Sequence, residues 1–146
     1  MPIKSFRAKI ANDTIDIIPL HTNNGSTGYR IKAFRVMGDS PGIAGATESV
    51  FKIYSIPQTS VDGLVDFSDN TLLAVGMWSS STDSWQSYET IVFDNMTFNQ
   101  DIYITYTDEQ GNESGNYYVE LETVKLGLDE NTVATLKDIR NITGNV

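Results

Sequence analysis

The segment TLLAVGMW at residues 71–78 decides the fold. It is almost continuously apolar, and it stands between the polar turn Ser68-Asp69-Asn70 and the polar stretch from Ser79 to Ser84. A short apolar run bounded by turn residues is typical of a β-strand that is covered on both faces. The sequence therefore predicts a layered β structure that buries this strand.

The segments on both sides of this strand alternate between apolar and polar residues. Near the N-terminus, Phe6, Ala8 and Ile10 alternate with Arg7 and Lys9, which predicts a strand with one face on a core. Further strands are expected at 14–18, 29–37, 50–56, 64–67, 88–93, 101–107 and 116–125.

Three of these expected strands carry a more detailed prediction. Residues 29–37 are apolar on both faces, which indicates either a bulge or cover on both sides. The strands at 101–107 and 116–125 are expected to pair as a hairpin with a long acidic tip. Eight or nine short strands with regular turns predict an all-β fold, an antiparallel β-sandwich or jelly roll.

Composition agrees with this fold class. Ile, Val and Thr together number 39, against 8 Leu and 7 Ala, a balance that excludes a helical bundle. A length of 146 residues suits a single domain, 1–146. A short C-terminal helix is expected at 129–141, with Leu136 and Ile139 on one side and Arg140 in its last turn. Such a helix must lie on its own sandwich or on a neighbouring subunit.

The chain lacks the side chains that several classes of enzyme need for catalysis. The chain has no Cys and one His, which excludes thiol nucleophiles, iron–sulfur clusters and Cys-bound zinc. His21 falls in a polar turn and is interpreted as a turn residue. No nucleophile elbow, metalloprotease helix or phosphate loop occurs. We therefore expect no enzyme and no cofactor, although a two-carboxylate glycosidase stays open as an alternative.

Two acidic segments are candidate calcium loops. Asp62, Asp66, Asp69 and Asn70 form one, and the segment 108–113 with Asp108, Glu109, Asn112 and Glu113 forms the other. Both offer hard oxygen ligands, but neither has the spacing of a helix–loop–helix calcium site. Solvated acidic turns are the alternative, and we assign no metal ligand.

Charge is distributed unevenly along the chain. The net charge is −9, which argues against nucleic acid or an anionic membrane as a partner. Residues 1–36 carry six basic and two acidic side chains, whereas residues 38–124 carry one basic and fourteen acidic ones. Either an N-terminal arm, residues 1–10, docks on the acidic body of a neighbouring copy, or basic and acidic strands lie side by side within one molecule.

Three aromatic residues, Trp78, Trp85 and Tyr88, flank one polar loop. Trp78 ends the apolar strand and is expected in the core. Trp85 stands between Ser84 and Gln86, and with Tyr88 it is a candidate for stacking on a sugar or for anchoring an interface. Burial of Trp85 is the alternative.

Five segments taken together resemble a known group of proteins. They are HTNNGSTGYRI (21–31), FSDNTLLAV (67–75), IVFDNMTFNQDIYIT (91–105), NYYVELETVKL (116–126) and TVATLKDIRN (132–141). The combination resembles small virion proteins of marine tailed bacteriophages. The resemblance implies a β-sandwich structural component of the capsid or the tail, and it supplies no catalytic residue.

The sequence thus predicts a non-enzymatic bacteriophage virion protein, a capsid decoration or cement protein, which is assembled in the host cytoplasm. Its expected partners are the major capsid protein or other virion proteins and further copies of itself, with a homotrimer favoured. A tail-associated carbohydrate- or receptor-binding module is the alternative. The candidate interface residues are Phe6, Arg7, Lys9, Trp85, Tyr88, Leu136, Ile139 and Arg140.

Overall fold

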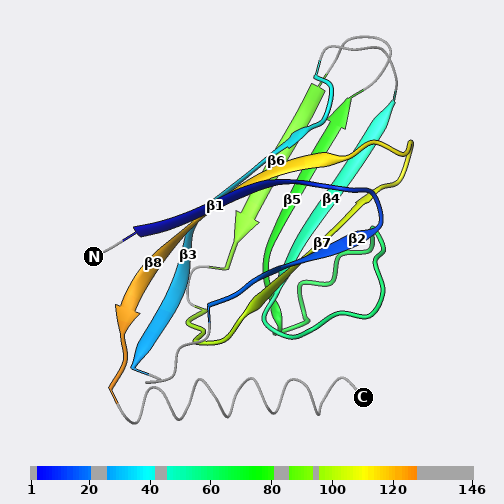
Figure 1. The fold of residues 1–146 in the computed structure, drawn as a ribbon. Helices are drawn as coiled ribbons and strands as arrows, with labels where there is room; N and C mark the ends of the chain where they lie inside the picture. Colours follow the sequence, from blue (N-terminus) through cyan, green and yellow to red (C-terminus); the bar gives the residue numbers. More distant parts are fainter. Residues whose placement is uncertain (1–2, 21–25, 42–45, 81–85, 94–95, 128–146) are drawn as a thin grey trace.

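The computed structural model describes residues 3–20, 26–41, 46–80, 86–93 and 96–127, and these form an all-β sandwich. Eight antiparallel strands make two sheets (Figure 1). The strands are β1 (Ile3–Ile10), β2 (Thr14–Ile18), β3 (Thr27–Gly38), β4 (Thr47–Tyr54), β5 (Leu72–Ser80), β6 (Gln86–Val92), β7 (Ile102–Asp108) and β8 (Gly115–Lys125). The expected helix at 129–141 lies outside the described residues.

The strand order is that of a jelly roll with one departure. The small sheet has the order β1-β8-β3 and the large sheet β2-β7-β4-β5-β6. A jelly roll can be described as one long hairpin that is rolled up, so that the first strand pairs with the last, the second with the last but one, and so on. The pairs β1–β8, β2–β7 and β4–β5 follow this order here. β6 departs from this order, because it pairs with β5 and packs on β3 without joining the small sheet.

This order overturns the expected hairpin between the last two strands. β7 lies in the large sheet between β2 and β4, whereas β8 lies in the small sheet between β1 and β3. Both edges of each strand are therefore occupied by other strands, and the acidic segment after β7 carries the chain from one sheet to the other. Asp108, at the end of β7, holds this crossover through its carboxylate.

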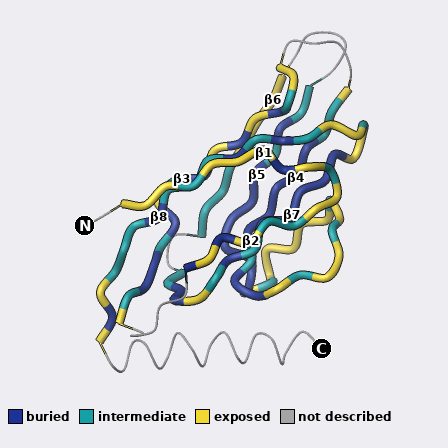
Figure 2. Tube along the Cα trace, viewed as in Figure 1, coloured by how far each residue is buried: buried dark blue, intermediate teal, exposed yellow. Residues whose placement is uncertain are grey.

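The core lies between the two sheets and is rich in aromatic rings. Phe51 of β4 stands at its centre, with ring centroids 4.6 Å from Tyr106 of β7 and 6.4 Å from Phe34 of β3. Figure 2 shows β4, β5 and β7 mostly buried, and β1 and β6 mostly exposed. The face of β1 that was expected on the core is covered in part, because Ile10 is fully buried and Phe6 packs against the core, while most of this edge strand is exposed.

The apolar strand that decided the fold is β5, and it is covered on both faces over most of its length. On the inner face, a Cβ added at Gly76 would lie 2.7 Å from Val36 of β3, so the two strands approach closely. On the outer face, the segment between β4 and β5, residues 55–71, lies beside Val75 and Met77. We call this segment the β4–β5 loop.

Two further details of the sequence patterns can be compared with the structure. Of the two alternatives for residues 29–37, a bulge or cover on both faces, a bulge is present, because the register of β3 with β8 shifts between Ile31 and Ala33. The short strand expected at 64–67 is wrong, because these residues belong to the β4–β5 loop. The ends of this loop are joined by the bond from Ser55 N to Thr71 O, 2.9 Å, so it forms a compact Ω-like loop.

Candidate functional site

A groove of about 740 Å³ opens where the outer face of the small sheet meets β5 and β6. We call it the cationic groove. Its side-chain lining comes from β1, β3, β8, β5 and β6, and includes Arg7, Lys9, Arg35, Met37, Trp78, Tyr88, Asn116 and Tyr118.

Strand register places the floor of this groove. Val119 of β8 is buried, so its neighbour Tyr118 points outward from the sheet. Tyr118 pairs with Arg7 of β1 on one side and with Arg35 of β3 on the other. Residues directly opposite in antiparallel strands share a face, so two guanidinium groups flank one phenol ring.

The wall of the groove is formed by two aromatic rings of the large sheet. Trp78 of β5 and Tyr88 of β6 are register partners, and their rings stack with centroids 6.5 Å apart. Trp78 is 7% exposed because β3 ends against it, where a Cβ at Gly38 would lie 2.5 Å from the indole Nε1. Tyr88 is 67% exposed, so its ring is presented to solvent on a buried support.

The charged side chains that line the groove are all basic. Lys9 forms an ion pair with Asp39, with Nζ 2.6 Å from Oδ1. Within the described part of the chain, neither Arg7 nor Arg35 has an ion pair. The hydroxyl of Tyr118 donates to Glu120 Oε1 at 2.6 Å, a bond that raises the pKa of this phenol, while the charge of Arg35 acts to lower it. The groove therefore offers free cations and ring faces, which suit an anionic ligand.

A second exposed surface lies on the opposite side of the sandwich. Leu64, Val65 and Phe67 of the β4–β5 loop project large apolar side chains into solvent, with exposed fractions of 78%, 44% and 56%. We call these three residues the apolar tip. Beneath them, Val65 borders a small pocket of about 220 Å³ over Val75, on the outer face of the large sheet.

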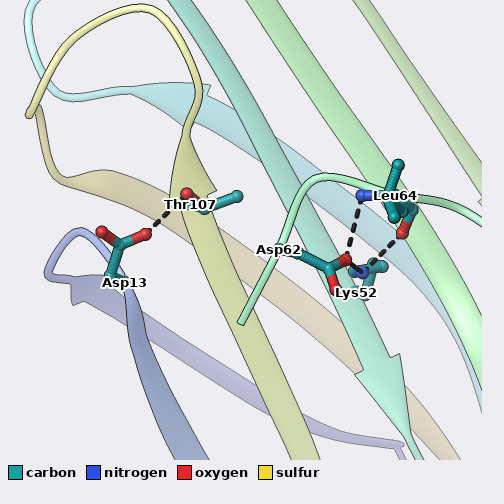
Figure 3. A network of polar contacts seen from close by, with 5 residues as sticks. All are labelled: Asp13, Lys52, Asp62, Leu64 and Thr107. Atoms are coloured by element: carbon teal, nitrogen blue, oxygen red, sulfur yellow. Dashed lines mark hydrogen bonds and ion pairs between the residues drawn. The ribbon is translucent and has the colours of Figure 1, made fainter. Parts of the chain in front are cut away.

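A buried lysine supports the apolar tip from below (Figure 3). Lys52 of β4 is 4% exposed, and its Nζ donates to Asp62 Oδ1 at 3.0 Å and to the Leu64 carbonyl oxygen at 2.6 Å. Asp62 Oδ1 also accepts from Leu64 N, at 3.0 Å. The hydrogen bond from Lys52 holds the pKa of Asp62 below its usual value. The tip is thus fixed to a central strand by charged hydrogen bonds.

Most acidic side chains of the two candidate calcium loops hold the backbone of their own turns. Asp62 accepts from Leu64 N, Asp66 from Ser68 N, and Asp69 from Thr71 N. Among the described residues, no group of three or more His, Cys, Asp or Glu is placed to hold a metal ion. Asp62, Asp66 and Asp69 therefore act as turn residues, which is the alternative to calcium ligands that the sequence left open.

Asp108 is the most heavily bonded of these carboxylates. Burial acts to raise its pKa, but four backbone N–H groups outweigh burial and hold the pKa below 3.8. The four donors are the amides of Glu48, Gln110, Gly111 and Glu113. The same turn is fastened to the β1–β2 connection, where Asn12 Oδ1 accepts from Asp108 N, and where Asp13 accepts from the Thr107 hydroxyl (Figure 3).

The structure brings together three of the candidate interface residues named from the sequence. Arg7, Lys9 and Tyr88 all line the cationic groove. Phe6 is half-buried and packs against the core. Trp85, Leu136, Ile139 and Arg140 lie outside the described residues.

Residues 3–10 of the predicted N-terminal arm form β1, which pairs with β8 of the same molecule over its whole length. The two flanking strands carry only basic charged side chains, Lys4, Arg7 and Lys9 on β1 and Arg30, Lys32 and Arg35 on β3. β8 between them carries Glu120 and Glu122, and Glu122 lies opposite Arg30. Basic strands therefore flank an acidic one inside one molecule, as the second interpretation of the charge distribution expected.

Several site residues were not found from the sequence. The alternation of apolar and polar residues predicts that Arg35 and Tyr118 point outward from their strands. Only the placement of β8 between β1 and β3 brings both of them beside Arg7. The apolar tip did leave a signal, namely three large apolar residues between Asp62 and Asp69, which we interpreted as a strand.

Comparison with known proteins adds no family assignment: the chain matches no protein-family model and no curated protein. Across the described ranges, no helix is long and apolar enough to cross a membrane.

Proposed function

We propose that this protein is a non-enzymatic structural subunit of a tailed-bacteriophage virion, a decoration protein that adheres to the capsid shell through the apolar tip. The single observation that carries the proposal is the exposure of Leu64, Val65 and Phe67 on a loop that Lys52 holds in place. Large apolar side chains on a fixed support bind with little loss of conformational entropy, which is what an adhesive contact requires.

Two other observations support this proposal. The five sequence segments quoted above resemble small virion proteins. The jelly-roll strand order is also used by viral capsid domains, although lectin domains use it too, so this support is an analogy of fold.

The adhesive mechanism follows from buried area. Fully burying a leucine or phenylalanine side chain stabilises a contact by about 1.5–3 kcal/mol. Each subunit contributes one tip, and an oligomer, for which we propose a trimer, multiplies the contact through avidity. The partner is the major capsid protein or another virion protein, and assembly takes place in the host cytoplasm.

Particles provide the test of this proposal. Mass spectrometry of purified virions is expected to find hundreds of copies of the chain per particle, and mild denaturant is expected to release them while the shell survives. Wild-type protein added back to stripped shells rebinds, whereas Leu64→Ser/Phe67→Ser does not. Ile3→Ser is the matched control, because Ile3 is an exposed apolar residue on the small sheet. Absence of the chain from particles, or equal rebinding of all three proteins, contradicts the proposal.

A second candidate function is favoured by the cationic groove. An exposed tyrosine backed by a tryptophan, beside free arginines, suits a carbohydrate- or receptor-binding module associated with the tail. Specific binding of a glycan that Tyr88→Ala abolishes would support this candidate.

A further inference from the structure

We propose that the cationic groove binds an acidic oligosaccharide whose sugar units carry carboxylates. The inference rests on the second candidate function, that the groove binds a glycan, and adds the chemical class of the ligand. It does not depend on adhesion through the apolar tip. The two surfaces lie on opposite faces, because the groove opens on the outer face of the small sheet and the tip covers the outer face of the large sheet.

The charge of the groove is opposite in sign to the net charge of the chain. The whole chain carries −9, yet the charged side chains that the structure places in the groove lining are Arg7, Lys9 and Arg35. Lys9 is already neutralised by Asp39, so the guanidinium groups of Arg7 and Arg35 are the cations available to a ligand. A guanidinium group binds a carboxylate through two parallel hydrogen bonds, which makes arginine suited to this anion.

Aromatic rings lie beside the two arginines on the floor and the wall of the groove. Tyr118 lies between the two arginines on the floor, and Tyr88 stands on the wall with Trp78 stacked behind it. Rings with a polar edge present a flat apolar face to the C–H groups of a sugar. The exposed Tyr88 also offers its hydroxyl to the oxygens of the sugar, whereas the Tyr118 hydroxyl already donates to Glu120. The arginines on the floor would bind the carboxylates of such a ligand, and the aromatic rings on the floor and the wall would pack against the faces of its sugar rings.

The size and the surroundings of the groove favour a sugar over an acidic protein segment as its ligand. A volume of about 740 Å³ lies within the range of sites that enclose small ligands. A stable protein partner buries about 800 Å² on each side, with few charges at the centre of the contact. The small sheet around the groove carries Glu120 and Glu122 on its outward face, next to the basic residues. This mixed charged surface is a poor centre for a protein interface, and we infer a sugar.

Isothermal titration with matched oligosaccharides tests the inference on the full chain. The probes are an oligogalacturonate and its carboxyl-reduced counterpart, which has the same sugar skeleton with CH₂OH in place of each carboxylate. Wild-type protein is expected to bind the oligogalacturonate about tenfold or more tightly than the reduced sugar, since hydrogen bonds to charged groups contribute about 1.5–3 kcal/mol.

Variants locate the binding in the groove. Arg7→Gln/Arg35→Gln is expected to weaken oligogalacturonate binding about tenfold or more and to leave the reduced sugar unaffected. Tyr88→Ala is expected to weaken both sugars by about three- to tenfold, whereas Tyr88→Phe keeps the ring and most of the affinity. Lys32→Gln is the matched control, because Lys32 is exposed on β3 outside the groove lining.

These measurements distinguish failure of the acidic-sugar inference from failure of glycan binding itself. Equal affinity for both sugars overturns the acidic class and leaves glycan binding standing. No binding of either sugar at millimolar concentration overturns both. If a polyglutamate peptide binds more tightly than the oligogalacturonate, and Tyr88→Ala does not affect it, then the occupant is an acidic protein segment and the inference is wrong.

Discussion

The ammonium group of Lys52 donates a 2.6 Å hydrogen bond to the carbonyl oxygen of Leu64, so a buried cation in a central strand holds an exposed apolar residue. Lys52→Met removes this bond and the bond to Asp62, and is expected to lower the free energy of unfolding by about 1–3 kcal/mol. The cost stays moderate because the Asp62 side chain is 57% exposed and remains solvated.

Hydrogen exchange locates the effect of Lys52→Met. The Leu64 amide, which donates to Asp62, is expected to lose protection first, before the amides of β4 and β5. Urea denaturation of Lys32→Met supplies the control, because Lys32 is exposed. Equal stability loss in both variants would mean that Lys52 does not support the tip.

Gly115 begins β8 at a point where the core admits no side chain. A Cβ there would lie 2.5 Å from both the Phe51 Cζ and the Tyr106 Cε1 atoms. Because both rings are buried and packed, Gly115→Ala is expected to destabilise the protein by about 1–3 kcal/mol through overpacking. Thermal unfolding measures the effect. Gly127→Ala is the control, since a Cβ at Gly127 meets nothing within 4 Å, and an equal melting temperature for the two variants would refute the packing argument.

Acid stability is expected to depend on Asp108. Its pKa is lower in the folded protein than the ordinary value of 3.8, so its carboxylate contributes stability above that value. The contribution is lost as the pH falls below about 4 through the folded-state pKa. Asp108→Asn is therefore expected to cost about 2 kcal/mol at neutral pH and progressively less in acid. Urea denaturation from pH 7 to pH 2.5 checks this, and a difference between the two proteins that is independent of pH would contradict it.

Alkaline stability is expected to depend on Tyr106. Burial raises the pKa of its phenol from 10.0 to about 12, against the hydrogen bond with Ser49, which lowers it. The folded protein therefore favours the neutral phenol, and this stabilisation is lost as the pH rises from 10 to about 12. The phenylalanine in Tyr106→Phe cannot ionise. Between pH 10 and about 12, the free energy of unfolding of the wild type is therefore expected to fall more steeply than that of the variant, and the two slopes differ by about 1.4 kcal/mol per pH unit. Denaturation at several alkaline pH values measures the slopes, and equal slopes would exclude this role.

The positions of most strands could be predicted from the sequence because alternation is a local signal. β2, β5 and β8 lie within a residue or two of their expected bounds, and the bulge in β3 is one of the two alternatives that residues apolar on both faces indicate. Which strands pair is not a local property. β7 and β8 are neighbours along the chain and look like a hairpin, yet the jelly roll pairs β8 with β1, more than 100 residues away in sequence.

The same limit explains the candidate site. Arg7 and Tyr88 could be singled out by residue type, but the cationic groove depends on strand neighbours that are not local in sequence, because β8 lies between β1 and β3, and β3 ends against Trp78 at Gly38. The residue types of Leu64 and Val65 predict a strand. They lie in a loop instead, because Lys52 of β4 donates hydrogen bonds to Asp62 and to the Leu64 carbonyl oxygen, contacts that the alternation of apolar and polar residues does not reveal.

The location of the chain in an electron density map of the intact particle tests the central proposal most directly. We expect many copies on the outer shell, with Leu64, Val65 and Phe67 buried against the capsid lattice and the cationic groove facing solvent. A map in which the chain is absent, or in which the β4–β5 loop points away from every neighbouring subunit, would contradict it.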